Sequence, residues 1–285
     1  MISKVSIILP THNGMKFLRG AIDSCLAQTH RNIELILVDD RSTDATPEIM
    51  ESYKDPRVRV IRNRTNQRLP RSLNIGFKEA TGEYLTWTSD DNEYSPDAIE
   101  KMLQALRKEP TVDFVYADYW ALDETTGKKE LVRAPDTLRL DVKNEVGGCF
   151  LYSRKVYEML GGYNPYYEMV EDHDYWIRVW KRFSARRCPG PLYLYRYHEQ
   201  SLTTTRHFNQ DLFDIILKFR NGYAPLSKLG WTAAYYFDNM KRSGKSEEEK
   251  QRLIRHTRET VAGLSRPFYV LFSLLAFLYS FRVKK

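Results

Sequence analysis

Three groups of acidic residues each follow an apolar run, where carboxylates could do chemistry. The first group, Asp39 and Asp40, comes directly after residues 33–38. Acidic residues at strand ends of doubly wound sheets hydrogen-bond a nucleobase or a ribose, so this group indicates a nucleotide site. The same loop contains Asp44, whose side chain is suited to cap a following helix. A purely structural loop is therefore the alternative.

The second group is Asp90 and Asp91, which follow an apolar run at residues 84–87. Adjacent carboxylates repel each other, so the pair is unfavourable unless a cation or hydrogen-bond donors compensate. Oxygen ligands suit Mg²⁺ or Mn²⁺, and such an ion would bridge two phosphate oxygens of a bound diphosphate. The alternative is a solvated turn that binds no metal.

The third group is Glu171, Asp172 and Asp174, at the start of a stretch in which Trp176 and Val179 have helical spacing. A positioned carboxylate in this place could take the proton from an attacking hydroxyl group. Acidic residues at a helix N-terminus also favour the helix dipole whatever the protein does, so helix stabilisation is the alternative.

Apolar patterning predicts strands that alternate with helices. Short, often β-branched runs predict strands at residues 5–9, 33–38, 58–61, 84–87 and 114–117, with Pro10 ending the first. Helical spacing predicts helices at residues 15–28, 44–53, 73–80, 96–108 and 172–183, and the polar stretch 123–143 predicts a hairpin or loop excursion. This alternation predicts an open, largely parallel α/β sheet, in which ligands bind at the carboxyl ends of the strands.

The composition indicates which kinds of partner and which cellular compartment to expect. The 285 residues carry a net charge of +7, which favours anionic partners such as phosphorylated ligands or an anionic membrane surface. Nucleic acid is not expected, because the basic residues are spread along the chain without a zinc-finger or RNP motif. The three cysteines are far apart and form no C-x-x-C motif, and the N-terminus lacks a signal-peptide core. These features predict a cytoplasmic protein.

Four motifs, in this order, resemble those of family 2 glycosyltransferases of the GT-A fold. Residues 5–44 resemble the opening of these enzymes, and residues 68–82 followed by Thr-Ser-Asp-Asp-Asn resemble their donor-binding segment and DxD metal motif. Residues 169–172 resemble the ED motif on the acceptor side, and residues 195–201 resemble a closing motif of the catalytic domain. The resemblance covers about residues 4 to 205 and is nearest to enzymes of bacterial surface and spore-coat polysaccharide synthesis.

The resemblance implies a nucleotide pocket at the first strand ends. Pro10, Thr11 and Asn13 would line this pocket through the turn after the first strand. Asp39 would accept a hydrogen bond from the base, which in this family is often uracil, and Arg71 would meet the nucleotide or its phosphates.

The resemblance also implies a metal site and a base. Asp90 would approach the ribose or the metal, Asp91 would ligate Mn²⁺ or Mg²⁺, and His198 would touch the metal or the diphosphate, although a lone histidine is more often structural. Asp172 would be the general base. The chain departs from the family at Thr88, where the longer form of the metal motif has an aspartate. The departure leaves open how many carboxylates hold the metal.

The implied reaction is a direct displacement with inversion at the anomeric carbon. The donor would be a nucleoside-diphosphate sugar, with UDP favoured by analogy, and the acceptor a hydroxyl group of a glycan or a lipid-linked molecule. We expect a nucleotide-sugar-binding half at residues 1–92, an acceptor-binding and catalytic half at 93–206, and a helical C-terminal extension at 207–285.

The apolar stretch at residues 267–281 has basic residues at both ends and is shorter than the roughly 20 residues that span a bilayer. One interpretation is an interfacial helix that makes peripheral contact with the cytoplasmic face of an anionic membrane. The other is a helix that packs on the core or in a homodimer. Membrane contact is favoured, because transferases of this kind often act on lipid-linked acceptors.

Two functions from other classes compete with glycosyl transfer. A nucleotide-dependent oxidoreductase should carry G-x-G-x-x-G after the first strand, where this chain has Pro-Thr-His-Asn-Gly. A nucleotide-sugar-binding protein without catalysis is disfavoured by the presence of both Asp91 and Asp172. Binding of nucleotide sugars with and without Mn²⁺, followed by an assay of UDP release, separates the three functions.

Overall fold

The computed structural model of the chain describes residues 3–202, 214, 217–218 and 220–223. The chain forms two compact units. The first comprises Met1–Tyr163 and Tyr175–Ser201, and the second comprises Asn164–Asp174 and Leu202–Lys285. The apolar stretch at residues 267–281, with its predicted membrane contact, lies outside the described residues, as does most of the predicted C-terminal extension.

The first part of the chain forms a parallel sheet with helical crossovers. Its strands are β1 (Val5–Thr11), β2 (Ile33–Asp39), β3 (Val58–Arg62) and β4 (Tyr84–Trp87), in the spatial order β3-β2-β1-β4. The crossovers contain α1 (Leu18–Leu26), α2 (Thr46–Ser52) and α3 (Arg68–Glu79). All the pairings in this half are parallel, so its strands end at one common edge. The predicted alternation of strands and helices is confirmed here.

One local prediction was wrong, because β1 continues through Pro10 to Thr11. Ile8 turns its carbonyl toward β4 and accepts from the N–H group of Thr88, so Pro10, two residues on, turns its nitrogen to the same side. The pairing of β1 with β4 ends at Ile8 and Trp87. Pro10 therefore removes no ladder hydrogen bond and fits within the strand.

The second part of the sheet mixes parallel and antiparallel pairs. The order continues from β4 through β8 (Phe150–Ser153), β6 (Val112–Asp123) and β9 (Ser184–Tyr197) to β5 (Glu93–Tyr94). β7 (Lys129–Val132) folds back on β6, which confirms the predicted hairpin. The helices of this part are α4 (Ala98–Lys108), α5 (Arg154–Leu160) and α6 (Glu171–Trp180), with a 3₁₀ turn at Pro165–Tyr167.

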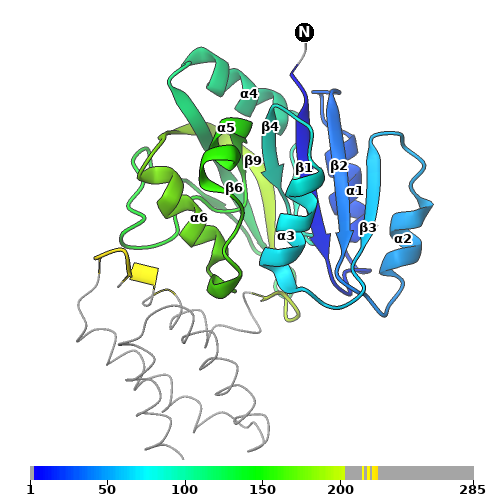
Figure 1. Cartoon of the computed structure of the whole chain (residues 1–285). Helices are drawn as coiled ribbons and strands as arrows, with labels where there is room; N and C mark the ends of the chain where they lie inside the picture. The colour runs from blue at the N-terminus through cyan, green and yellow to red at the C-terminus, as the bar shows by residue number, and fades with distance from the viewer. Residues whose placement is uncertain (1–2, 203–213, 215–216, 219, 224–285) are drawn as a thin grey trace, which may run out of the picture. The chain divides into compact units, whose positions relative to one another are not determined.

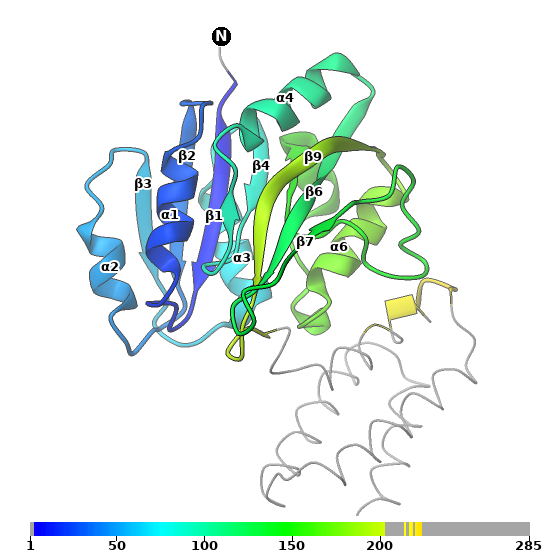
Figure 2. The same cartoon turned by 180° about the vertical axis from the view of Figure 1, so that it is seen from behind.

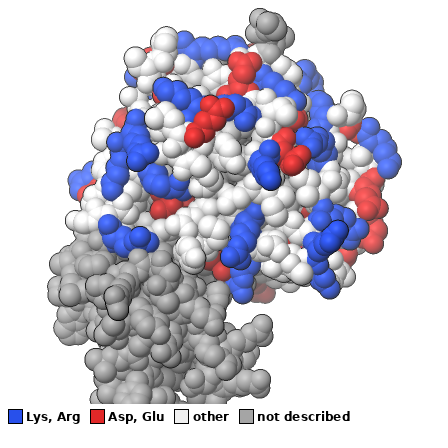
Figure 3. Space-filling view, viewed as in Figure 1, with Lys and Arg blue, Asp and Glu red and all other residues white. Residues whose placement is uncertain are grey.

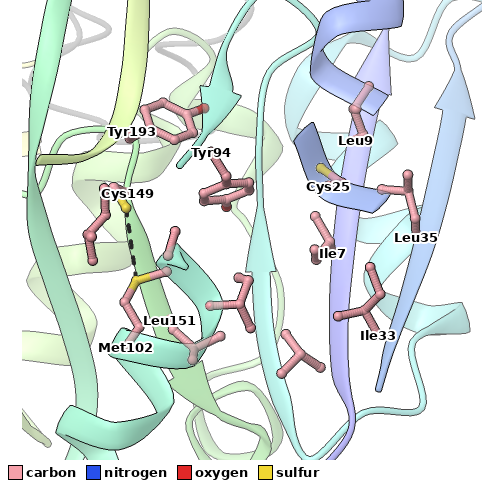
Figure 4. Close-up of a cluster of buried hydrophobic side chains, with 14 of the residues drawn as sticks. Ile7, Leu9, Cys25, Ile33, Leu35, Tyr94, Met102, Cys149, Leu151 and Tyr193 are labelled. Atoms are coloured by element: carbon pink, nitrogen blue, oxygen red, sulfur yellow. Dashed lines mark hydrogen bonds between the residues drawn. The ribbon is translucent and has the colours of Figure 1, made fainter. Parts of the chain in front are cut away.

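Helices cover both faces of the sheet in the first unit. Figure 1 shows α3, α5 and α6 in front of the strands, and Figure 2 shows α1 and α4 on the opposite face. Alternate residues of β1 and β2 pack on α1, and Figure 4 shows this cluster continuing to Met102, Cys149 and Tyr193. The other face buries an aromatic cluster in which Trp176 contacts Phe114 and Phe150. The open α/β sheet predicted from the sequence is thus confirmed.

Charge on the surface is mixed. On the face in Figure 3, Lys and Arg side chains are scattered among Asp and Glu side chains and form no single basic patch. The expectation that the basic excess is spread along the chain was wrong, because residues 1–202 contain 29 Lys and Arg against 30 Asp and Glu, and the net charge of +7 comes from residues 203–285.

Glu34 is a buried carboxylate at the N-terminal end of β2, opposite to the carboxyl ends of the parallel strands. It accepts from Ser6 Oγ at 2.6 Å, Lys4 Nζ at 2.9 Å and the backbone N–H of Thr81 at 2.6 Å. Burial alone would raise the pKa of Glu34, but these hydrogen bonds outweigh burial and lower it from 4.5 to about 2. Glu34 therefore stabilises the fold in its ionised form.

Glu34→Gln is expected to lower the free energy of unfolding by about 1–3 kcal/mol at pH 7, because an amide cannot replace the carboxylate for all its donors. The pKa is depressed in the folded state, so the contribution is complete above pH 4.5 and is lost as the pH falls toward about 2. Urea unfolding of parent and variant between pH 7 and pH 2.5 measures this difference. The exposed Glu48→Gln is the control, and a difference between parent and Glu34→Gln that stays constant over this range would contradict the assignment.

Candidate active site

The carboxyl ends of β1, β2 and β4 lie side by side in the first unit. Thr11 at the end of β1 pairs with Asp39 at the end of β2, and Ile8 pairs with Trp87 at the end of β4. The ends of these strands and the loops that follow them carry most of the site residues predicted from the sequence. The strand order therefore gathers them at one edge of the sheet.

Asp39 is fully buried at this edge. The backbone N–H of Ser42 donates to its Oδ1 at 2.8 Å, and Arg62 Nε donates to its Oδ2 at 3.3 Å. Ser42 Oγ accepts from the N–H of Asn13, and Asn13 Oδ1 accepts from the N–H of Thr43, at 2.9 and 2.8 Å. These contacts join the loops after β1 and β2 and fix the carboxylate of Asp39.

Asp40 has a structural role that sequence reasoning missed. Its carboxylate is almost completely buried and accepts from the backbone N–H groups of Gln67 and Arg68, both at 2.7 Å, and from Asn63 Nδ2 at 2.8 Å. Asp40 thus satisfies free N–H groups at the start of α3. Asp44 accepts from the N–H of Thr46 at the start of α2, as the capping interpretation predicts. In the sequence Asp40 stands out only because it is next to Asp39, and no local pattern connects Asp40 with the start of α3.

Four non-glycine residues among those described have a left-handed backbone; three lie in loops next to candidate site residues, and Arg68 is the first residue of α3. They are Asn13 (φ 57°), Arg41 (φ 64°), Arg68 (φ 65°) and Met169 (φ 80°). This conformation is unfavourable for residues with a side chain and is concentrated at functional sites in proteins. The hydrogen bonds of Asn13 and of the Arg68 N–H hold two of these turns in place.

Asp90 is held against the end of β1, because Thr11 Oγ1 donates to its Oδ2. A side chain at Gly14 would collide with the pair, since a Cβ there would lie 2.1 Å from Asp90 Oδ2 and 2.5 Å from Thr11 Oγ1. Burial and the neighbouring negative charge of Asp91 raise the pKa of Asp90 well above its ordinary value. A carboxylate held in this environment favours a nearby cation.

Asp91 has one partnered and one unpartnered oxygen. Its Oδ2 lies 3.0 Å from His198 Nε2, whereas its Oδ1 is buried and has no hydrogen-bond partner among the described residues. Burial raises the pKa of Asp91 too, although the contact with His198 opposes this shift. The ring of His198 packs against Phe17 at 4.9 Å. A buried oxygen without a partner is a feature that a bound cation would explain.

The chemistry of these residues fits a hard divalent cation that shares its coordination with a ligand. Within the described parts of the chain, no group of three or more Asp, Glu, His or Cys residues is arranged to hold a metal unaided. Mg²⁺ and similar ions are commonly bound by one or two carboxylates together with phosphate oxygens and water. Asp90 and Asp91 fit this pattern, and His198 can ligate through Nε2 only by giving up its contact with Asp91.

Thr88, the departure from the family's metal motif, is turned toward the core. Its side chain is buried, and its Oγ1 lies 2.6 Å from the hydroxyl group of Tyr193. Pro10 is also buried, within β1, whereas Arg71 is exposed on α3, one turn after Arg68. The carboxylates that this segment presents are therefore those of Asp90 and Asp91.

Asp172 lies in the first turn of α6, in the second unit. The backbone N–H of His173 donates to its Oδ1 at 2.7 Å. The neighbouring Glu171 is almost completely buried, and its Oε2 has no hydrogen-bond partner among the described residues. Burial and the negative charge of Asp172 raise the pKa of Glu171 well above its ordinary value. Of this pair, the half-buried Asp172 is thus the more accessible to an acceptor.

Solved structures share the fold of this chain. TarS of S. aureus, crystallised with UDP, is 15% identical with a TM-score of 0.60, and the alignment covers 94% of this chain and 83% of TarS. A mannosyltransferase from Pyrobaculum calidifontis, in complex with GDP-Man and Mn²⁺, is 17% identical with a TM-score of 0.59 and coverages of 100% and 87%. The fold is therefore the GT-A fold of glycosyltransferases, as the sequence resemblance implied.

Sequence comparison identifies the protein family to which the chain belongs. The sequence model of Glycosyl transferase family 2 matches residues 6–161, and the chain belongs to this family. An uncharacterised glycosyltransferase of Rickettsia typhi is 32% identical over 213 residues, which cover 70% of this chain. The chain spans between 27% and 66% of the length of five Rickettsia relatives. In the part of the chain that the structure describes, no helix is long and apolar enough to cross a bilayer.

Proposed function

We propose that this protein transfers a sugar from a UDP-sugar to an acceptor hydroxyl group, with inversion and with the help of a divalent metal, in glycan or polysaccharide synthesis. The observation that carries the proposal is that Asp39 at the end of β2 and the pair Asp90–Asp91 after β4 lie on either side of the end of β1, in one parallel sheet. Asp39 is fixed for a base at one side of this edge, and the carboxylate pair is suited to the diphosphate at the other.

Support for the donor comes from Asp39 and its surroundings. Ser42 and Arg62 orient the two oxygens of Asp39, and the remaining lone pairs would accept from the N–H edge of a base when the loops around this fully buried side chain make room for it. Pro10, Thr11 and Asn13 form the adjoining turn, and the exposed Arg71 is available to a phosphate. TarS binds UDP and UDP-GlcNAc in its solved complexes, and we extend a uridine donor to this chain by analogy.

Support for a metal comes from the raised pKa values of the Asp90–Asp91 pair and from the unpartnered Oδ1 of Asp91. The related fold of the Pyrobaculum mannosyltransferase holds Mn²⁺ together with GDP-Man. We propose Asp91 and Asp90 as the protein ligands, with His198 beside Asp91. When bound, Mn²⁺ or Mg²⁺ would neutralise charge that builds on the departing diphosphate.

In this reaction Asp172 takes the proton from the acceptor hydroxyl group as the oxygen attacks the anomeric carbon. The bond from the anomeric carbon to the diphosphate breaks as the new glycosidic bond forms, so no covalent enzyme intermediate is needed. Donor and acceptor would meet in the cytoplasm, with a glycan or a lipid-linked molecule as acceptor. Peripheral membrane contact through residues 267–281 stays a prediction, as does the alternative of a homodimer.

Calorimetric titration with UDP, GDP and dTDP, in Mn²⁺ and then in excess EDTA, tests the donor assignment. We expect UDP to bind at least about tenfold more tightly than GDP in Mn²⁺, because one charge-assisted hydrogen bond to the N3–H group of a pyrimidine contributes on the order of 1.5–3 kcal/mol. Thymine has the same N3–H group, so the comparison with dTDP measures the contribution of the 2′-hydroxyl group and the effect of the C5 methyl group. A panel of UDP-sugars with assay of released UDP then identifies the sugar. Tighter binding of GDP or dTDP would refute the uridine assignment, and binding without turnover over the acceptor panel would favour the non-catalytic alternative.

A further inference from the structure

His173 follows the proposed base directly and is almost completely buried, at 2% exposed. Its ring does not point to solvent, because Nδ1 lies 2.9 Å from Oδ1 of Asp214. Asp214 comes 41 residues later in the chain, and both residues belong to the second compact unit. The contact thus joins a buried imidazole to a carboxylate that is distant in the sequence but adjacent in the fold.

Asp214 is itself fixed. Lys218, one turn further along, donates through Nζ to Oδ2 of Asp214 and leaves Oδ1 for His173. Burial would raise the pKa of Asp214, but the hydrogen bonds from His173 and Lys218 outweigh it and lower this pKa. Asp214 is therefore an ionised acceptor that keeps one ring orientation of His173.

The main chain of His173 is tied to the base in turn. Its N–H donates to Oδ1 of Asp172 at 2.7 Å, while the N–H of Asp174 bonds to the carbonyl of Val170 at 3.0 Å. The first turn of a helix has free N–H groups and frays readily. Here it also follows Met169, whose left-handed backbone is unfavourable. A side-chain anchor on His173 would keep this turn, and the carboxylate of Asp172 with it, in one geometry.

We propose that His173 and Asp214 form a positioning pair, in which Asp214 anchors the imidazole and the N–H of His173 orients the carboxylate of Asp172. This inference rests on the proposed role of Asp172 as base. Asp214 lies beyond residues 6–161, the part that the family's sequence model matches.

Steady-state kinetics of the 285-residue protein, with the UDP-sugar and the acceptor that give UDP release in the panels above, test the pair. Asp214→Ala and His173→Leu are each expected to lower kcat about 10- to 100-fold, because misplacement of about 1 Å at a reacting group has an effect of this order. Donor affinity should change less than twofold. The double variant should be no slower than the slower single variant, because residues that act through one contact are not additive. His173→Asn, which keeps a donor near the position of Nδ1, should recover most of the rate.

Hydrogen exchange gives a readout that does not depend on activity. In Asp214→Ala, amides at residues 169–176 should exchange at least about tenfold faster, with the midpoint of thermal unfolding changed little. Asn221→Ala is the matched control, because the amide of Asn221 donates to the carbonyl of Leu217, four residues back in the same segment. Its exchange over residues 169–176 and its kcat should equal those of the parent.

The possible results distinguish the positioning pair from the proposed function on which it rests. An active parent whose Asp214→Ala variant keeps its kcat and its exchange pattern would overturn the positioning pair alone. A purely structural role predicts lower unfolding temperature, weaker donor binding and no recovery in His173→Asn, and would overturn the pair as well. A parent without transfer to any acceptor would overturn the proposed function together with the inference that rests on it.

Discussion

Exchanging Asp91 for asparagine is expected to remove the gain in donor affinity that Mn²⁺ gives to the parent protein. Asparagine keeps the size of the side chain and can keep a hydrogen bond to His198, but it loses the charge that a divalent cation needs. Loss of a group that only orients a metal ligand lowers metal affinity about 10- to 100-fold, so loss of a ligand should lower it at least about 100-fold.

The measurement is UDP binding by calorimetry, with Mn²⁺ and with excess EDTA. Parent and variant should bind alike in EDTA and differ only in Mn²⁺. Asp44→Asn is the control, since it makes the same chemical change at a neighbouring loop where the carboxylate accepts from the N–H groups of Thr46 and Met15. If Asp91→Asn kept the full response to Mn²⁺, Asp91 would not be a ligand, and the unpartnered Oδ1 would need another explanation.

The sequence predicted the parallel half of the sheet well because this half repeats one simple pattern. Residues 5–9 and 33–38 are β-branched runs, and both strands are completely buried in the structure. The rule that ligands bind at strand ends then led directly to Asp39, Asp90 and Asp91. In this half of the sheet the position of a residue in the sequence also gives its position in the fold, because Asp39 ends β2 and the pair Asp90–Asp91 follows β4 directly.

The strand β9 escaped prediction because its stabilisation is not local. Its sequence contains Arg186, Arg187, Pro189 and Gly190, which are typical of a loop. In the structure Arg187 forms an ion pair with the buried Asp118 at 2.7 Å, and Gly190 has a φ of 105° where the register with β6 shifts. An ion pair between residues 69 positions apart holds the strand, and no periodicity in the sequence indicates it.

Prediction of the site residues was limited in the same way, because their contacts are not local in the sequence. Adjacent aspartates at positions 39 and 40 look equivalent in the sequence, yet one is fixed by Ser42 and Arg62 and the other caps α3. Similarly, the sequence gives no reason to single out His173 among the acidic residues around it, because its partner Asp214 lies 41 residues away. Which residues follow a strand can be read from the sequence, whereas the partner that each side chain takes depends on tertiary structure.

Asp172→Asn is expected to leave donor binding intact and to lower the rate of transfer about 100-fold or more, the usual scale for the loss of a positioned base. Asparagine keeps the size and the ability to accept from the N–H of His173, but it cannot take a proton. The measurement combines UDP release in the presence of acceptor with calorimetric binding of UDP. A helix-stabilising role predicts the reverse result, because asparagine caps a helix N-terminus about as well as aspartate.

Glu171→Gln is the matched comparison for this prediction. Burial and the charge of Asp172 raise the pKa of Glu171 well above its ordinary value and so favour the protonated form, which resembles the amide. The transfer rate of Glu171→Gln should therefore stay within severalfold of the parent rate. If instead Asp172→Asn transferred sugar at nearly the parent rate while Glu171→Gln lost it, the base would be Glu171, and Asp172 would serve to raise its neighbour's basicity through their mutual repulsion.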